Sequence, residues 1–174
     1  KYDHQKLRFG DVESALVRAD HVVEGRYQMS PIEQAPTETC GAIAAPETND
    51  RYVVYTSTQA LFFSLDTTAK LLRVPSNRLH LIGGTVGGGF GGKETQGNLM
   101  AACAALVARA TGRAAKLRLD RDDDMLMTGK RHDFVIDYDV GFDDTGRIAG
   151  IEFRLVSRCG MSADLSGAIN DRAM

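Results

Sequence analysis

The chain has 174 residues, 43% of them hydrophobic, which is enough to bury a core in one domain or a tightly joined pair. Its 21 basic residues are scattered among 23 acidic ones and give a formal net charge of -2, which excludes a basic stripe for nucleic acid or anionic lipid. No signal peptide is visible, and no apolar run reaches the length of about 20 residues that spans a bilayer.

The three cysteines, Cys40, Cys103 and Cys159, are odd in number and far apart in the sequence. This spacing argues against a disulfide framework and against a zinc or iron-sulfur site made by this chain alone. We therefore expect a reducing, cytoplasmic location. The chain begins at Lys1 without a methionine and stops at Met174 without a tail-like composition, so we expect a segment of a longer polypeptide.

The first part of the chain predicts one short helix followed by three strands. Residues 10–19 place apolar side chains on one helical face after Asp11, which can cap the first turn. Three segments rich in strand-forming residues follow, at 21–29, 37–45 and 51–57. Prolines and turn-forming residues lie between them, so each is expected to form its own strand.

The middle of the chain predicts two helices that alternate with strands. The first helix is expected in residues 58–74, with Thr58 as its N-cap. A strand at 78–84 leads into a glycine-rich loop. An alanine-rich helix follows at 95–112, and Gly112 is expected to end it.

The last third predicts mainly β structure. A strand at 114–119 precedes the acidic run Asp120–Asp124, which we interpret as a solvated loop or helix start because it lacks the ligand spacing of a calcium loop. Residues 133–157 contain two alternating apolar runs about a turn, the pattern of an antiparallel hairpin. Since strands outnumber helices, we predict an α+β fold in which a layered antiparallel or mixed sheet packs against helices.

The most unusual segment is the strand-to-helix loop, which holds seven glycines in the ten positions from Gly83 to Gly92. Each glycine costs about 0.5 to 1 kcal/mol of backbone entropy relative to alanine, and a simple corner would need only two or three of them. We therefore expect the main chain here to approach a ligand. The amides before the following helix favour an anionic or oxyanionic one.

Two nucleotide-binding motifs match this loop incompletely. Residues 87–93 fit the G-x-x-x-x-G-K part of a P-loop, but Glu94 stands where a magnesium-binding Ser or Thr is required. The same glycines satisfy the G-x-G-x-x-G fingerprint of a dinucleotide-binding domain, yet the candidate acid, Asp120, lies 28 positions past Gly92 and no repeated β-α-β units are predicted. Both remain weaker alternatives. We interpret Lys93 as a structural or ion-pairing residue, because nothing nearby in sequence would desolvate it.

Several ordered stretches of the chain carry a family resemblance. They are GDVESALVRADHVVEGRY at 10–27, STQ at 57–59, GGGFGGKET at 87–95 and AALVARATGRAAKLRLDRDDDMLMTGKRHDF at 104–134. Together they resemble the molybdenum-binding large subunit of the molybdenum hydroxylases, the relatives of xanthine dehydrogenase and aldehyde oxidase. The resemblance implies that residues 1–174 are the first molybdopterin-binding portion of a larger subunit. The ligand of the loop would then be molybdenum-molybdopterin, with or without an appended nucleotide.

The resemblance also implies roles for individual residues. Gln59 falls where the family's glutamine donates a hydrogen bond to an oxo ligand of molybdenum, and an amide does so without adding charge. The backbone at Gly88, Gly89 and Phe90 is expected to lie against the cofactor's oxygen ligands, with no side chain here ligating the metal directly. Glu94 matches a glutamate that orients a nitrogen-containing substrate ring; the alternative is an ordinary capping acid in the first turn of a helix.

The implied activity is that of an oxidoreductase, which hydroxylates a purine-like N-heterocycle or an aldehyde. The resemblance places [2Fe-2S] and FAD on other domains or subunits, which would be partners together with the rest of the molybdenum subunit. The family's catalytic base and substrate-binding arginine belong to motifs that this chain lacks, so the chain alone is expected to be inactive. The remaining alternative is a stand-alone cofactor-binding or assembly module without catalysis.

Overall fold

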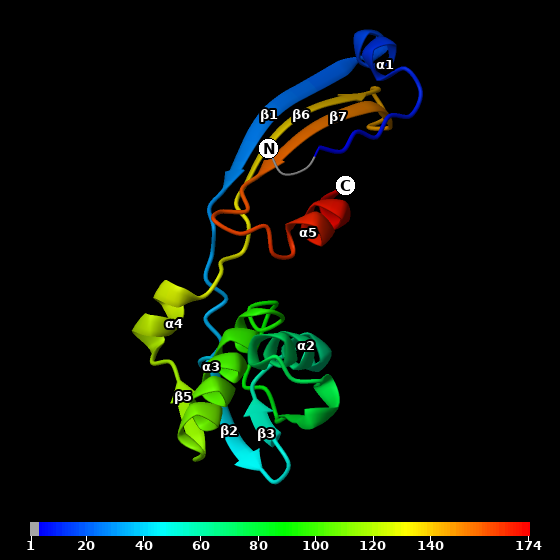
Figure 1. Cartoon of the computed structure of the whole chain (residues 1–174). Coiled ribbons are helices and arrows are strands. Elements are labelled where there is room, and N and C mark those ends of the chain that lie inside the picture. Colours follow the sequence, from blue (N-terminus) through cyan, green and yellow to red (C-terminus); the bar gives the residue numbers. More distant parts are fainter. Residues whose placement is uncertain (1–3) are drawn as a thin grey trace. The chain divides into compact units, whose positions relative to one another are not determined.

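The computed structural model describes residues 4–174, and the chain divides within them into two compact units (Figure 1). Unit 1 comprises the residues up to Ile32 together with His132–Met174, and unit 2 comprises Glu33–Arg131. Unit 2 is therefore inserted into unit 1 in the sequence. Across residues 4–174, no helix has both the length and the apolar character needed to cross a membrane.

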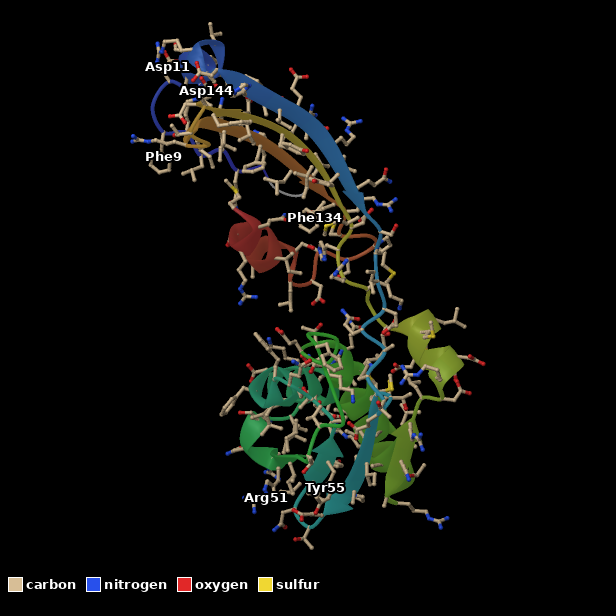
Figure 2. The ribbon with its side chains drawn as sticks, turned by 180° about the vertical axis from the view of Figure 1, so that it is seen from behind. Phe9, Asp11, Arg51, Tyr55, Phe134 and Asp144 are labelled. Carbon is tan, nitrogen blue, oxygen red and sulfur yellow. The ribbon has the colours of Figure 1, made fainter. Side chains whose placement is uncertain are left out.

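Unit 1 is an antiparallel three-stranded sheet with a short helix packed on it. Its elements are α1 (Val12–Arg18), β1 (His21–Met29), β6 (Phe134–Phe142), β7 (Ile148–Ser157) and α5 (Ser166–Ala173). The strand order is β1-β6-β7, so β6 and β7 form the predicted hairpin. Gly141 and Gly150 leave room for α1 on these strands. Asp11, labelled in Figure 2, caps α1 as predicted by accepting the Ser14 N–H.

Unit 2 is a mixed four-stranded sheet with helices. Its elements are β2 (Gly41–Glu47), β3 (Arg51–Thr56), α2 (Leu61–Leu72), the short 3-10 helix η1 (Ser76–Arg78), β4 (Leu79–Gly83), α3 (Gln96–Thr111), β5 (Ala115–Arg118) and α4 (Arg121–Met127). The strand order is β4-β3-β2-β5. β3 and β4 run parallel with α2 between them in the chain, and the other pairs are antiparallel. This arrangement confirms the predicted α+β class.

The core of unit 2 lies between α3 and the sheet. Small buried side chains dominate both sides of this contact: Ala101, Ala104, Ala105 and Ala108 on α3, and Ala42 and Ala44 on β2. They let the helix backbone approach the strand closely, as dense packing requires. Gly112 ends α3 with φ at 66°, the left-handed conformation in which glycine is favoured and which its position predicts.

Two helix starts differ in detail from the sequence prediction. The N-cap of α2 is Ala60, not Thr58, because the Thr58 hydroxyl accepts the Ala60 N–H at 3.1 Å and donates to the Lys93 carbonyl at 3.2 Å. The acidic run does start a helix, α4, with Asp120 as its N-cap. Asp124 in that run is buried rather than solvated, however.

Candidate functional site

The glycine-rich loop follows β4 and ends where α3 begins. Its backbone enters the left-handed region at Gly88 (φ 96°), Phe90 (φ 53°) and Gly91 (φ 85°). This conformation is unfavourable for a bulky side chain such as that of Phe90, which is also 76% exposed. Contacts of the loop backbone, rather than burial of the aromatic ring, must therefore fix the conformation of Phe90.

The side chain of Gln59 lies directly against the loop. Its Oε1 accepts hydrogen bonds from the backbone N–H groups of Gly91 and Lys93, both at 3.1 Å. The Gln59 N–H donates to the Lys93 carbonyl at 2.9 Å. Only the oxygen of an amide can accept hydrogen bonds, so these two contacts set the orientation of the side chain and leave Nε2 as the available donor.

Two of the loop glycines are needed because side chains of this chain approach them. A Cβ atom on Gly89 would lie 2.3 Å from Gln59 Oε1, and one on Gly87 would lie 2.6 Å from the Cβ of Glu38. Part of the glycine content therefore serves packing within the protein. The expectation that a ligand alone accounts for the glycines is therefore incomplete at these two positions.

The tip of the loop presents backbone donors. The Gly92 N–H donates to the Gly89 carbonyl at 2.7 Å, whereas no acceptor within residues 4–174 is hydrogen-bonded to the N–H groups of Gly88, Gly89 and Phe90. Successive N–H groups in such turn conformations form concave sites that bind anions. The loop tip is thus a group of donors suited to an oxyanion.

A buried ion pair supports the loop. Lys93 is 0% exposed, and its Nζ donates to the Glu38 carboxylate at 2.8 Å and to the Ser57 hydroxyl at 3.0 Å. The predicted ion-pairing role of Lys93 is confirmed. Its burial was not predicted, because the side chains that bind it, those of Glu38 and Ser57, are 55 and 36 positions away in sequence.

Glu38 connects three parts of this region. In addition to Lys93 it accepts the Ser57 hydroxyl at 2.6 Å and the Gly87 N–H at 2.8 Å, and its own N–H donates to the Gly87 carbonyl at 3.1 Å. Partial burial raises the pKa of the Glu38 carboxyl, but the hydrogen bonds from Lys93, Ser57 and Gly87 outweigh this effect and hold the pKa at about 2. Glu38 was not among the predicted site residues, because the partners of Glu38 lie 19 to 55 positions away in sequence.

The depressed pKa of Glu38 predicts a pH dependence of stability. A carboxyl whose pKa falls from 4.5 to about 2 on folding stabilises the folded state above about pH 5, and this contribution disappears as the pH falls toward 2. We expect Glu38→Gln to lower the chemical denaturation midpoint near neutral pH, and the gap to the wild type to narrow progressively on acidification. A gap that stays constant from pH 6 to pH 2.5 would contradict this account of the ion pair.

Glu94 lies at the end of the loop. It precedes Thr95, the N-cap of α3, and the first turn of α3 contains no acidic residue. The alternative interpretation of Glu94 as a first-turn capping acid is therefore wrong. No hydrogen bond or ion pair joins Glu94 to another residue in the part of the chain that the structure describes. The side chain of this half-buried residue thus makes no contact of these kinds that would stabilise the described fold.

An open depression of about 440 Å³ occupies another part of unit 2. It is lined by residues of β2, β3 and β5, among them Tyr55, which Figure 2 labels, and it extends to Glu38 and Ser57. Gln59, Phe90 and Glu94 do not line it. The structure thus brings Gln59 together with the glycine loop, whose first residues, Gly84 and Thr85, also line this depression.

The family is decided by comparison with known proteins. The model of the family described as "Molybdopterin cofactor-binding domain" matches residues 1–174. The chain belongs to this family. Xanthine dehydrogenase/oxidase of Gallus gallus is 39% identical to this molybdopterin cofactor-binding domain over 171 residues, 98% of the chain and 13% of that protein. Aldehyde oxidase 2 of Cavia porcellus is 38% identical over 163 residues, 93% of the chain and 12% of that protein.

Solved structures agree with this assignment. Quinoline 2-oxidoreductase from Pseudomonas putida 86 superposes with a TM-score of 0.74 at 26% identity, over 83% of this chain and 18% of that chain. Aldehyde oxidoreductase from Desulfovibrio gigas gives a TM-score of 0.84 over 94% of this chain and 18% of that chain; at 22% identity it shows the fold alone. The resemblance to the molybdenum hydroxylases is therefore confirmed. The chain spans only 12 to 13% of the length of the two sequence relatives.

Proposed function

We propose that residues 1–174 are the first molybdopterin-binding portion of a larger molybdenum hydroxylase subunit. Family membership and the short span of the chain relative to its relatives support this. The observation that carries the proposal is the loop tip, where the N–H groups of Gly88, Gly89 and Phe90 are free of acceptors in the described residues and Gln59 Nε2 is an available donor.

These donors fit a cofactor with oxygen ligands. Peptide and amide N–H groups are neutral, so they bind oxo groups without placing a competing charge beside the metal. Gln59 and the backbone of Gly88, Gly89 and Phe90 would hold the cofactor through its oxygen atoms, and no side chain would ligate molybdenum directly. When bound, molybdenum-molybdopterin supplies the two-electron redox chemistry, while this chain positions it and orients the substrate.

The activity that we propose for the complete enzyme is oxidative hydroxylation of a purine-like N-heterocycle or an aldehyde. The names of the relatives, xanthine dehydrogenase/oxidase and aldehyde oxidase 2, support both substrate classes. Electrons would leave through [2Fe-2S] and FAD groups on other domains or subunits, which with the rest of the molybdenum subunit are the proposed partners. The catalytic base would come from outside these residues. The free cysteines Cys40, Cys103 and Cys159 suit the cytoplasm, where we place the enzyme.

Metal analysis of the complete enzyme tests the proposal. We expect molybdenum and pterin to co-purify with it in stoichiometric amounts, and chelation or loss of the cofactor to abolish turnover. Active full-length protein without molybdenum would contradict the proposal, and folded full-length protein without turnover would favour the alternative of a stand-alone cofactor-binding or assembly module without catalysis.

Replacement of Glu94 by alanine tests the substrate class. We expect kcat/KM for a purine-like substrate to fall about 10- to 100-fold, as for loss of a charge-assisted hydrogen bond, with molybdenum content unchanged. Molybdenum content should stay unchanged because Glu94 has no hydrogen-bonding or ion-pairing role in the described fold. Glu47→Ala, at the exposed end of β2, is the control and should change neither quantity. An equal loss of turnover and molybdenum in Glu94→Ala would show that Glu94 serves cofactor retention instead.

A further inference from the structure

We propose that Lys93 and Glu38 are a positioning pair that fixes the direction of the Gln59 amide. This inference rests on the proposed function, because the donor that they orient, Gln59 Nε2, is the one assigned to the cofactor. Lys93 and Glu38 would not contact the cofactor themselves. They would act on it through Gln59 and the loop.

The backbone of Lys93 contacts Gln59 and its neighbour Thr58. Its N–H donates to Gln59 Oε1, and its carbonyl accepts both the Gln59 N–H and the Thr58 hydroxyl. Lys93 is therefore bonded to the main chain and the side chain of Gln59 at the same time. Any shift of Lys93 moves the acceptor and donor that hold Gln59 in place.

The side chain of Lys93 is held by Glu38. Its ammonium group is anchored at 2.8 Å on Glu38, which also accepts the Gly87 N–H within the loop. The ion pair thus joins Gly87 to the end of the loop, where Oε1 of Gln59 accepts the N–H groups of Gly91 and Lys93. A reversed amide would turn its NH₂ group toward two N–H donors, so the closed loop favours one orientation of Gln59 strongly.

The charge of Lys93 is fully buried. An ammonium group that is 0% exposed has lost its hydration, and an apolar side chain of similar length would fill the same space without that penalty. Stability alone is therefore not a sufficient reason for a charged residue at position 93. Fixing Gly87 and the end of the loop in one geometry supplies a reason for the charge, because an ion pair with hydrogen bonds is directional.

The experiment compares variants of the full-length enzyme. Lys93→Met removes the anchor and leaves the Glu38 carboxylate, which is 40% exposed, to water. Glu38→Gln is a second variant that weakens the same anchor. Lys130→Met is the matched control, since it removes an ion pair of 2.6 Å with Glu33 elsewhere in unit 2. The readouts are molybdenum per chain and hydrogen exchange of peptides from the loop and from β3.

We expect Lys93→Met to speed exchange of the loop amides at least about tenfold and to lower molybdenum content about 10- to 100-fold, as for other losses of supporting hydrogen bonds around a metal. Glu38→Gln should change both quantities in the same direction by less. Exchange of β3 should speed up much less than exchange of the loop, and all values for Lys130→Met should match the wild type. Gln59→Glu keeps the acceptor but loses the donor, so it should retain slow loop exchange and still lose molybdenum.

The outcomes separate this inference from the proposed function. Wild-type exchange and molybdenum content in both Lys93→Met and Glu38→Gln would overturn the positioning role. Equal acceleration of the loop and of β3 would also overturn it, since the pair would then only stabilise the fold. If the wild-type enzyme holds no molybdenum, the proposed function fails. Faster hydrogen exchange of the loop but not of β3 in Lys93→Met would still show that Lys93 and Glu38 order the loop.

Discussion

Replacing Gly89 by alanine is expected to lower the molybdenum content of the full-length enzyme at least about tenfold, the size of effect seen when groups supporting a metal site are displaced. The added Cβ would lie 2.3 Å from Gln59 Oε1 and 2.5 Å from its Cδ, so the amide must move. Its hydrogen bonds to the N–H groups of Gly91 and Lys93 are then lost. Because Gln59 is exposed, its side chain can move aside, and the fold should survive.

The control for this substitution is Gly84→Ala in the same loop. A Cβ on Gly84 meets nothing within 4 Å, so molybdenum content and thermal unfolding should equal those of the wild type. Metal analysis measures the molybdenum content of each variant, and a thermal unfolding curve measures its stability. Normal molybdenum content in Gly89→Ala would show that the position of the Gln59 amide does not matter for the cofactor.

The second large effect is expected on stability, at Asp124. This buried carboxylate accepts the Cys40 N–H at 3.0 Å and pairs with Arg121 at 3.1 Å. Asp124→Ala should lower the free energy of unfolding by about 2 to 3 kcal/mol, because it leaves the buried Cys40 N–H without an acceptor and removes the partner of Arg121. Chemical denaturation of wild type and variant gives this difference.

Asp122→Ala is the matched control on the same helix. Asp122 is exposed and lies in the first turn of α4, and its side chain makes no hydrogen bond or ion pair within residues 4–174. Its removal should therefore cost only the interaction with the helix dipole, less than about 1 kcal/mol. Similar losses for the two substitutions would contradict the role assigned to burial and to the Cys40 contact.

Local signals predicted most of the secondary structure. The bounds of β1 agree with the expected segment 21–29, and Gly112 ends α3 where expected. Strand alternation and helix caps depend on neighbours in sequence, which explains this success. The N-cap of α2 was misplaced for the opposite reason: Thr58 is engaged with Lys93, which follows it by 35 positions.

The candidate site was predicted only in part. The density of glycines pointed to close approach at the loop, and the structure shows it, with Gln59 beneath Gly89. Neither the role of Glu38 nor the burial of Lys93 is visible in sequence, because their contact joins residues 55 positions apart. The bounds of the two units were not predicted either, since the pairing of β1 with β6 depends on segments on either side of unit 2.

Anomalous diffraction at the molybdenum absorption edge, from crystals of the full-length enzyme, tests the central claim most directly. The account predicts a strong peak beside the loop tip, at a distance where oxygen ligands of the metal reach the Gly88, Gly89 and Phe90 amides and Gln59 Nε2. A molybdenum peak remote from these donors, with the loop amides bonded to protein or turned into solvent, would contradict it.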